Sequence, residues 1–168
     1  MKLKQVTPTK VPVGDMEFYI RPFPAFKAAN ITGELASVLT PLLGMLVPLI
    51  SESGEKEENE EKTILDTDAA KAAEAMANCP AIDGNRMEKL MKKLLLGGHI
   101  AVELEDENGN TEEEELTQDL ADEIFCGNIQ DMFVLCFHVI RLNFRGFFGK
   151  LPILSGKVKF PREVRKVM

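Results

Sequence analysis

Histidine is the side chain best suited to acid–base chemistry near neutral pH, and this chain has two, His99 and His138. His99 follows two glycines at the start of an alternating apolar segment. His138 lies inside a long apolar segment, close to Arg141. Neither histidine has a cysteine or a carboxylate at the spacing of a metal site or a catalytic triad. We therefore interpret both as structural residues.

The acidic segment 106–117 comes nearest to a metal-binding motif. Its first Asp and Asn residues suit the early ligand positions of a calcium loop. However, Thr111 stands where such a loop needs glycine, and Thr117 stands where it needs a bidentate glutamate. A hairpin turn at Asn108-Gly109 explains the same residues, and we interpret the glutamates 112–115 as a solvated acidic edge. We therefore predict no metal site here.

Motifs of the common enzyme classes are also absent from the sequence. It contains no glycine-rich phosphate loop, no Gly-x-Ser-x-Gly and no His-Glu-x-x-His. Without a nucleophile or an acid–base constellation, we predict that the protein is not an enzyme. It follows that we expect neither catalytic residues nor a cofactor.

The composition narrows the class of protein further. A net charge of −7 argues against nucleic acid as a partner. Cys79, Cys126 and Cys136 have no paired spacing, which favours reduced, buried thiols in a cytoplasmic protein. Residues 138–168 are basic, and we leave open whether they contact an acidic partner, the acidic body of the chain, or solvent.

The amino-terminal part combines a short strand with a strongly apolar helix. Residues 1–15 are polar and look extended or loosely ordered, whereas Met16–Arg21 mixes aromatic and β-branched residues and predicts a strand. A helix is predicted from 25 to 50, with a brief break expected around 31–34. Its segment 35–50 has sixteen uncharged residues. Because a bilayer span needs about 20 apolar residues, we predict a kinked core or partner-binding helix and no membrane contact.

The carboxy-terminal part follows a glutamate-rich segment. An alanine-rich stretch predicts a helix over 68–77, and apolar residues at i, i+3, i+4 and i+7 predict another over 85–96. Alternation predicts strands over 99–105 and 111–116, joined by the Asn108-Gly109 turn. Thr117 is expected to cap a helix over 118–125.

A nearly uninterrupted apolar segment then predicts a long helix over 129–148, with Asn128 at its amino-terminal cap. The polar residues Asp131, His138, Arg141 and Arg145 share one narrow face of this helix. This face is too small for docking to be its main task, so we interpret the helix as the carboxy-terminal core helix. Helical spacing places Phe133, Phe137 and Phe144 in the core.

These elements predict a mainly α fold of the α+β class, a helical domain with a small antiparallel β element. Whether the strand at 16–21 pairs with the hairpin at 99–116 is open at this point. We expect three parts: residues 1–50 with the strand and the apolar helix, an acidic linker over 51–65, and a helical domain over 66–168 with the hairpin and the core helix.

Two stretches resemble a known family. Arg21–Leu43, with its Pro-x-Pro junction between strand and apolar helix, and Glu123–Phe148, with its Cys-Gly turn and long apolar helix, are similar to tail assembly chaperones of long-tailed bacteriophages and prophages. The second stretch ends in the Asn-x-x-Gly-Phe-Phe pattern of residues 143–148.

The resemblance implies a non-catalytic function. Such proteins bind the tape measure protein, a long, hydrophobic, helical chain that sets tail length, and keep it soluble until tail tube subunits replace them. It also implies a location in the host bacterial cytoplasm, absence from the mature virion, and in some phages a frameshift-extended form. We expect the tape measure protein as the partner, with the tail tube protein as a further one, and either a homo-oligomer or several copies on one partner.

Apolar helical surfaces are the predicted partner-binding sites, since methionine and leucine faces accept varied helices. Simple core packing is the alternative for each residue. A structural tail or head–tail connector component is the alternative function, and a membrane-active protein is a third. The predicted contact residues are Leu39, Leu42, Leu43, Leu46, Met87, Met91, Phe147 and Phe148.

Overall fold

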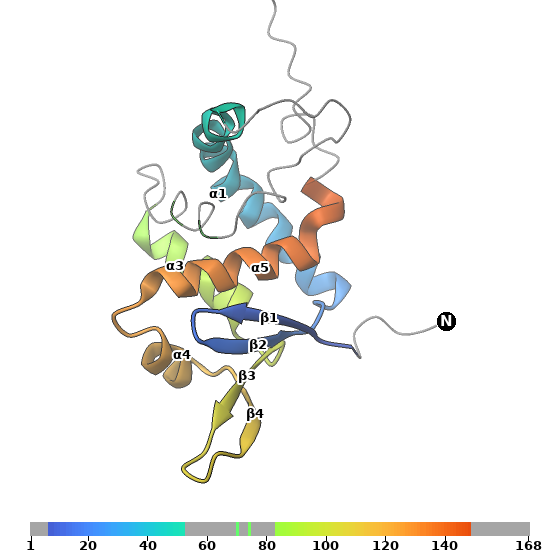
Figure 1. Cartoon of the computed structure of the whole chain (residues 1–168). Helices are drawn as coiled ribbons and strands as arrows, with labels where there is room; N and C mark the ends of the chain where they lie inside the picture. The colour runs from blue at the N-terminus through green and yellow to red at the C-terminus, as the bar shows by residue number, and fades with distance from the viewer. Residues whose placement is uncertain (1–6, 53–69, 71–73, 75–82, 149–168) are drawn as a thin grey trace, which may run out of the picture.

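A computed structural model describes residues 7–52, 70, 74 and 83–148 of the chain (Figure 1). The described part contains a four-stranded antiparallel sheet and the helices α1, α3, α4 and α5. The predicted α+β class with a small antiparallel β element is therefore confirmed.

The sheet has the strand order β1-β2-β3-β4. The strands are β1 (Thr9–Val13), β2 (Met16–Ile20), β3 (Ile100–Glu105) and β4 (Thr111–Glu115). The predicted strand at 16–21 and the predicted hairpin are confirmed, and they do pair, with Phe18 opposite Val102 in the register of β2 and β3.

Strand β1 is the element that the sequence reasoning missed, because residues 1–15 looked extended or loosely ordered. It pairs antiparallel with β2 through a two-residue turn at Gly14 and Asp15. Gly14 has a φ of 58°, a left-handed conformation that suits glycine in such turns. Pro12 is compatible with β1 because β1 is an edge strand of this sheet.

Four helices complete the described fold: α1 (Ala25–Glu52), α3 (Gly84–Leu95), α4 (Gln118–Ile124) and α5 (Ile129–Phe148). Helix α1 runs without the break predicted at 31–34. The side chains of Ile31 and Leu35 are fully buried there, and this packing outweighs the low helix propensity of the exposed Gly33. Of the helix predicted over 68–77, only residues 70 and 74 are described, and both are helical.

The core lies where α5 contacts β1, α1 and α3 (Figure 1). Phe133, Phe137 and Phe144 are buried, as the helical spacing predicts. From α3, Leu90 and Leu94 are buried as well. Phe18 from β2 stacks on Phe125, with ring centroids 5.9 Å apart, and so connects the sheet to the end of α4.

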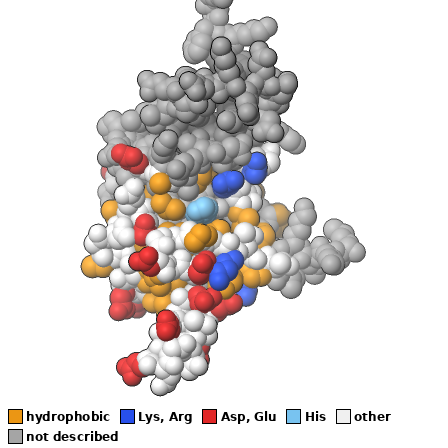
Figure 2. All heavy atoms as spheres, in the orientation of Figure 1, with side chains coloured by type: hydrophobic (Ala, Val, Ile, Leu, Met, Phe, Trp, Pro, Cys, Tyr) orange, Lys and Arg blue, Asp and Glu red, His pale blue; other side chains and the backbone are white. Residues whose placement is uncertain are grey.

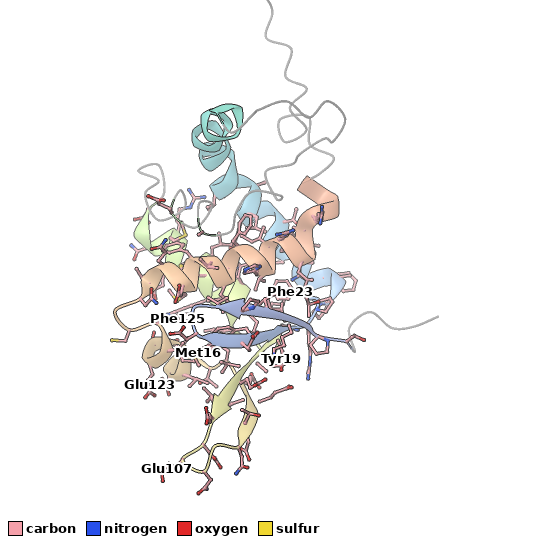
Figure 3. The ribbon with its side chains drawn as sticks, viewed as in Figure 1. Met16, Tyr19, Phe23, Glu107, Glu123 and Phe125 are labelled. Atoms are coloured by element: carbon pink, nitrogen blue, oxygen red, sulfur yellow. The ribbon has the colours of Figure 1, made fainter. Side chains whose placement is uncertain are left out.

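Phe23 anchors the junction between β2 and α1 (Figure 3). Its ring lies edge-on against His99 and Phe144, and the Lys27 ammonium lies 4.6 Å from the ring centroid. Its backbone N–H donates a hydrogen bond of 2.7 Å to Oδ1 of Asn143 on α5. The two stretches that carry the family resemblance are thus joined directly in space.

The β3–β4 hairpin extends away from α1 and α5, with Glu107 near its tip (Figure 3). Every residue of β4 is exposed, which agrees with a solvated acidic edge. The Asp106 carboxylate accepts hydrogen bonds from the backbone N–H groups of Asn108 and Asn110, and these bonds lower its pKa. The residues that resembled a calcium loop therefore stabilise a tight turn.

The predicted division into 1–50, 51–65 and 66–168 stays a prediction. Residues 51 and 52 of the predicted acidic linker belong to α1, and the rest of this linker lies outside the described residues. Strand β2 of the predicted first part nevertheless pairs with β3 of the predicted last part. Within the described ranges, no helix has the length and apolar character that crossing a membrane requires.

Candidate partner-binding groove

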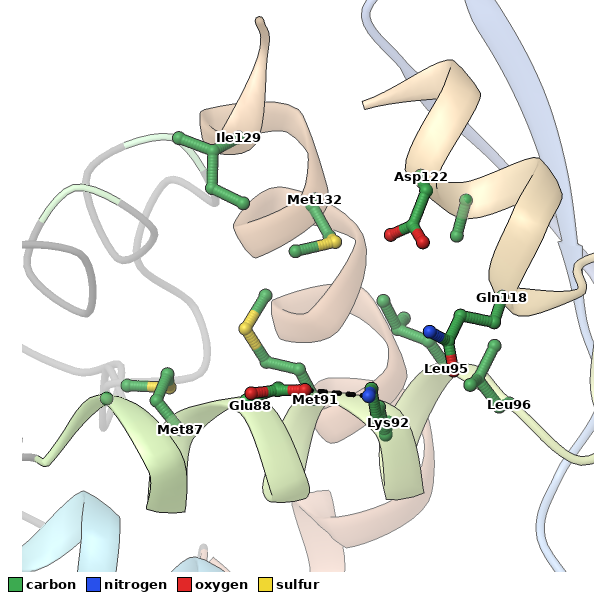
Figure 4. Close-up of a pocket in the computed structure, with 12 residues that line it drawn as sticks. Met87, Glu88, Met91, Lys92, Leu95, Leu96, Gln118, Asp122, Ile129 and Met132 are labelled. Atoms are coloured by element: carbon green, nitrogen blue, oxygen red, sulfur yellow. Dashed lines mark ion pairs between the residues drawn. The ribbon is translucent and has the colours of Figure 1, made fainter. Parts of the chain in front are cut away.

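A groove of about 490 Å³ lies between α3, α4 and the first turns of α5 (Figure 4). Helix α3 contributes one wall, with lining residues spaced at three and four positions from Gly84 to Leu95. Helix α4 forms the other wall through Gln118, Ala121 and Asp122. The groove brings α3 together with α4 and α5, whose lining residues follow those of α3 by more than twenty positions in the sequence.

Local sequence signals place these walls. Helix α3 begins after Asp83, which has the extended backbone conformation of an N-cap residue. Helix α4 is capped by Thr117, whose hydroxyl oxygen accepts a hydrogen bond from the backbone N–H of Leu120, as predicted. Helix α5 begins directly after Asn128, the predicted cap position, and the Asn128 side-chain amide donates to the Asp131 carboxylate. The Thr117 cap and the Asn128–Asp131 bond fix where the groove-lining faces of α4 and α5 start, whereas the Asp83 side chain makes no capping hydrogen bond to α3.

The lining of the groove is mainly apolar and rich in methionine. Met87 is half-buried, Met91 is buried, and Met132 faces them from α5 (Figure 4). Ile129, one turn before Met132, is 54% exposed at the rim. Methionine side chains are flexible and adapt to partners of different shape, so this lining suits an apolar ligand.

The charged residues of the groove lie at its rim. Glu88 and Lys92 form an ion pair of 2.7 Å one turn apart on α3, and this pair lowers the pKa of Glu88. On the opposite wall the exposed carboxylate of Asp122 has no hydrogen bond or ion pair with any residue in the described ranges. The rim is therefore neutral on the α3 side and negative on the α4 side.

The predicted contact residues fall into two groups in the structure. Met87 and Met91 both line the groove, although Met91 is only 7% exposed. The predicted leucines lie on α1 beyond Val38, and the predicted phenylalanine pair ends α5; the side chains of both sets lie outside the described part. They are Leu39, Leu42, Leu43, Leu46, Phe147 and Phe148.

The sequence reasoning missed the other half of the groove. The sequence pattern places Ile129 and Met132 only within the core helix and assigns no role to Asp122, whereas all three line the groove. One signal could have indicated an apolar groove face: Ile129 and Met132 lie at spacing i, i+3 next to the start of the helix. Nothing in the sequence pattern, however, placed these residues opposite Met87 and Met91.

His99 borders a smaller cavity of about 180 Å³ together with Arg21, Glu113 and Glu115. Burial lowers the pKa of His99, and the nearby Lys27 and Arg21 lower it further. The imidazole packs against the ring of Phe23 at 5.2 Å between centroids. These contacts support the structural interpretation of His99.

His138 is half-buried on α5. Burial lowers its pKa, and the charge of Arg141 lowers it further. Cys136, two positions earlier, is fully buried, and burial raises the pKa of its thiol. Cys126 is exposed, so the expectation of buried thiols holds for Cys136 but is wrong for Cys126, while Cys79 lies outside the described residues.

We expect the stability of the protein to fall as the pH is lowered from about 7.5 to about 5.5, across the unperturbed histidine pKa of about 6.5. The folded state depresses the pKa of His138, so the unfolded state binds a proton first, and this favours unfolding. Urea unfolding of wild type and His138→Gln at both pH values measures the effect.

The pH dependence should be shallower in His138→Gln, with the remainder due to His99, whose pKa is also lowered. The acids with lowered pKa values, such as Glu88 and Asp106, titrate below this pH range, so they do not contribute to the change in stability within it. An unchanged slope in His138→Gln would show that His138 does not contribute.

Comparison with known proteins decides the family. A family model described as phage tail assembly chaperone protein, TAC, matches residues 14–156. The chain belongs to this family. The resemblance of 21–43 and 123–148 to tail assembly chaperones is thereby confirmed, and the match also includes the groove helices α3 and α4. No match to this chaperone was found among curated proteins or among solved structures.

Membership of the family gives the general role of the protein. It is a tail assembly chaperone, and such a role implies interaction with tail proteins. On the face shown in Figure 2, exposed apolar side chains lie among acidic ones.

Proposed function

We propose that this chaperone binds the tape measure protein, a long, apolar, helical chain, and keeps it soluble in the host bacterial cytoplasm until tail tube subunits replace it. The observation that carries the proposal is the family match over residues 14–156. In this account the protein acts by binding and release and catalyses no reaction.

The groove supports this proposal physically. A chaperone for an apolar helix must present apolar surface while remaining soluble itself. Met87, Met132 and Ile129 supply accessible apolar surface, and the net charge of −7 favours solubility. The apolar face of an amphipathic helix in a hydrophobic groove is a common mode of peptide recognition.

Further contact surfaces belong to the same proposal. The predicted leucines of α1 and the phenylalanine pair at 147–148 would extend the contact along the partner. A tape measure protein is long, so we propose that several chaperone copies bind it, either independently or as a homo-oligomer. Neither nucleic acid nor a membrane is part of this function.

Co-expression with the tape measure protein of the same phage or prophage tests the proposal. We expect the two chains to co-purify through an affinity tag on the chaperone. If the tape measure protein does not stay bound to the tagged chaperone and is lost in the washes, the proposed partner is wrong.

Mass spectrometry of purified particles tests the release step. A chaperone that is replaced by tail tube subunits should be absent from the mature virion. Recovery of the chain in fixed proportion to the tail proteins would instead favour a structural tail or connector component.

A further inference from the structure

We infer that the groove between α3, α4 and α5 binds an amphipathic helix that carries a Lys or Arg beside its apolar face, with this cation against Asp122. The inference rests on the proposed function and deepens it, because it names the binding site and the pattern that the partner helix must carry. The groove would recognise the partner segment by its apolar face and its adjacent cation.

The form of the groove favours a helix as the ligand. The α3 wall runs from Gly84 to Leu95, and twelve helical residues span about 18 Å, or roughly three turns. The α4 wall runs from Gln118 to Asp122 on the opposite side (Figure 4). Two helical walls with an apolar floor form a groove in which the apolar face of a partner helix can lie along α3.

The apolar contacts have an exposed anchor. Ile129 and Phe26 are the large hydrophobic residues with strongly exposed side chains in the described part of the chain. Only Ile129 lines the groove, next to Met132 and opposite Met87. Burying these side chains under a partner helix would remove apolar surface from water, which favours association.

Charge then selects the kind of helix. The carboxylate of Asp122 lies exposed at the rim, and within the described residues no cation neutralises it. Asp119 and Glu123 are exposed on the same helix but do not line the groove, so they do not contact a ligand bound in it. On the opposite wall Lys92 is paired with Glu88. A cation on the α4 side of the ligand is therefore favoured, and an anion there is repelled.

The acidic residues of α4 argue against a second copy of the chaperone binding in the groove through its own α4. Two α4 helices that approach each other would bring Asp119, Asp122 and Glu123 against their own equivalents. Like charges across an interface are destabilising. The tape measure helix, rather than another chaperone, is thus the partner to which we assign the groove.

Two synthetic helical peptides of about 18 residues, roughly 27 Å long, are the probes. Both carry the same leucine face, and one has lysines on the flank where the other has glutamates. Fluorescence anisotropy with the full chain, at near-physiological salt, should show about tenfold tighter binding of the lysine peptide, a difference of about 1.4 kcal/mol. At this salt the screening length is about 8 Å, so the readout favours charges in direct contact.

Charge reversal provides the decisive variant. Asp122→Lys should reverse the preference, so that the glutamate peptide binds more tightly than the lysine peptide. Glu123→Lys is the matched control: it makes the same change of charge on the same helix, at an exposed residue that does not line the groove. We expect this control to keep the preference of the wild type.

A second pair of variants tests the apolar contact. Ile129→Asp should weaken binding of both peptides by about tenfold or more, since it places a carboxylate at the apolar anchor. Phe26→Asp makes the same change at a residue that is 91% exposed and outside the groove, and should leave both affinities unchanged. Circular dichroism should report an intact fold for both variants, because both side chains are exposed.

Three outcomes would overturn the inference. The wild type could bind neither peptide, as expected if another segment of the chain fills the groove. Asp122→Lys could behave like Glu123→Lys. A wild-type oligomer could dissociate on Ile129→Asp in sedimentation experiments, which would assign the groove to a second copy.

Failure of the inference is distinguishable from failure of the proposed function. If the tape measure protein co-purifies equally well with Asp122→Lys and Ile129→Asp, the chaperone function stands and the groove is not its site. If the wild type does not co-purify with the tape measure protein, the proposed function is wrong whatever the peptides do.

Discussion

Phe137→Asp is expected to unfold the chaperone. The Phe137 side chain on α5 is 5% exposed and belongs to the central core cluster. Truncating a buried phenylalanine to alanine costs about 3–5 kcal/mol, and an unpaired buried carboxylate adds a desolvation penalty. Domains are commonly stable by only about 5–15 kcal/mol, so this change removes most or all of the stability.

Circular dichroism and urea unfolding measure this effect, and Phe26→Asp is the matched control. The substitution is the same, but Phe26 is 91% exposed at the start of α1 and should leave the free energy of unfolding nearly unchanged. If Phe137→Asp remained folded while Phe26→Asp did not, the assignment of α5 to the core would be wrong.

Asn143→Ala is expected to destabilise the protein by about 1–3 kcal/mol, the cost of leaving a buried partner group without its hydrogen bond. Oδ1 of Asn143 accepts the hydrogen bond from the backbone N–H of Phe23, and Nδ2 donates to the carbonyl oxygen of Val139 at 2.9 Å. Pro22 and Pro24 flank Phe23 and have no N–H of their own. Phe23 therefore has the one backbone N–H within residues 22–24, and the bond to Asn143 ties this N–H to α5.

Hydrogen exchange at the Phe23 amide measures this tether directly, and urea unfolding gives its free energy. The amide should exchange faster in Asn143→Ala. Asn85→Ala, at an exposed position of α3, makes the same change of side chain and should alter neither quantity. Unchanged protection of the Phe23 amide in Asn143→Ala would show that the hydrogen bond does not hold the junction.

The Asn143 bond also gives a physical meaning to the family pattern. The Pro-x-Pro junction and the Asn-x-x-Gly-Phe-Phe ending are 120 positions apart at Phe23 and Asn143, yet they meet in one hydrogen bond. Phe144 of the same pattern packs edge-on against Phe23. These motif residues therefore hold the strand–helix junction onto the core helix.

Local signals predicted most elements of the described fold. Alternating apolar residues and Asn108-Gly109 predicted the β3–β4 hairpin, and helical periodicity predicted α3 and α5. Strand β1 was missed because Thr9–Val13 contains a proline and has no apolar alternation strong enough to stand alone. This strand is stabilised by pairing with β2 and by packing against α5. The Gly14-Asp15 turn was the signal that could have revealed it.

The groove could be predicted only in part. Periodicity identified the Met87 and Met91 face, because both lie on one stripe of α3. It did not identify Ile129 or Asp122, since the relative placement of α3, α4 and α5 depends on tertiary packing between distant segments. Sequence periodicity shows which face of a helix is apolar, but not which other helix lies opposite.

The soluble fraction of the tape measure protein tests the central claim most directly. The protein is expressed with and without this chaperone at equal levels, and the lysate is separated by centrifugation into supernatant and pellet. We predict that the tape measure protein moves from the pellet to the supernatant when the chaperone is present. An equal soluble fraction in the two cultures would contradict the account.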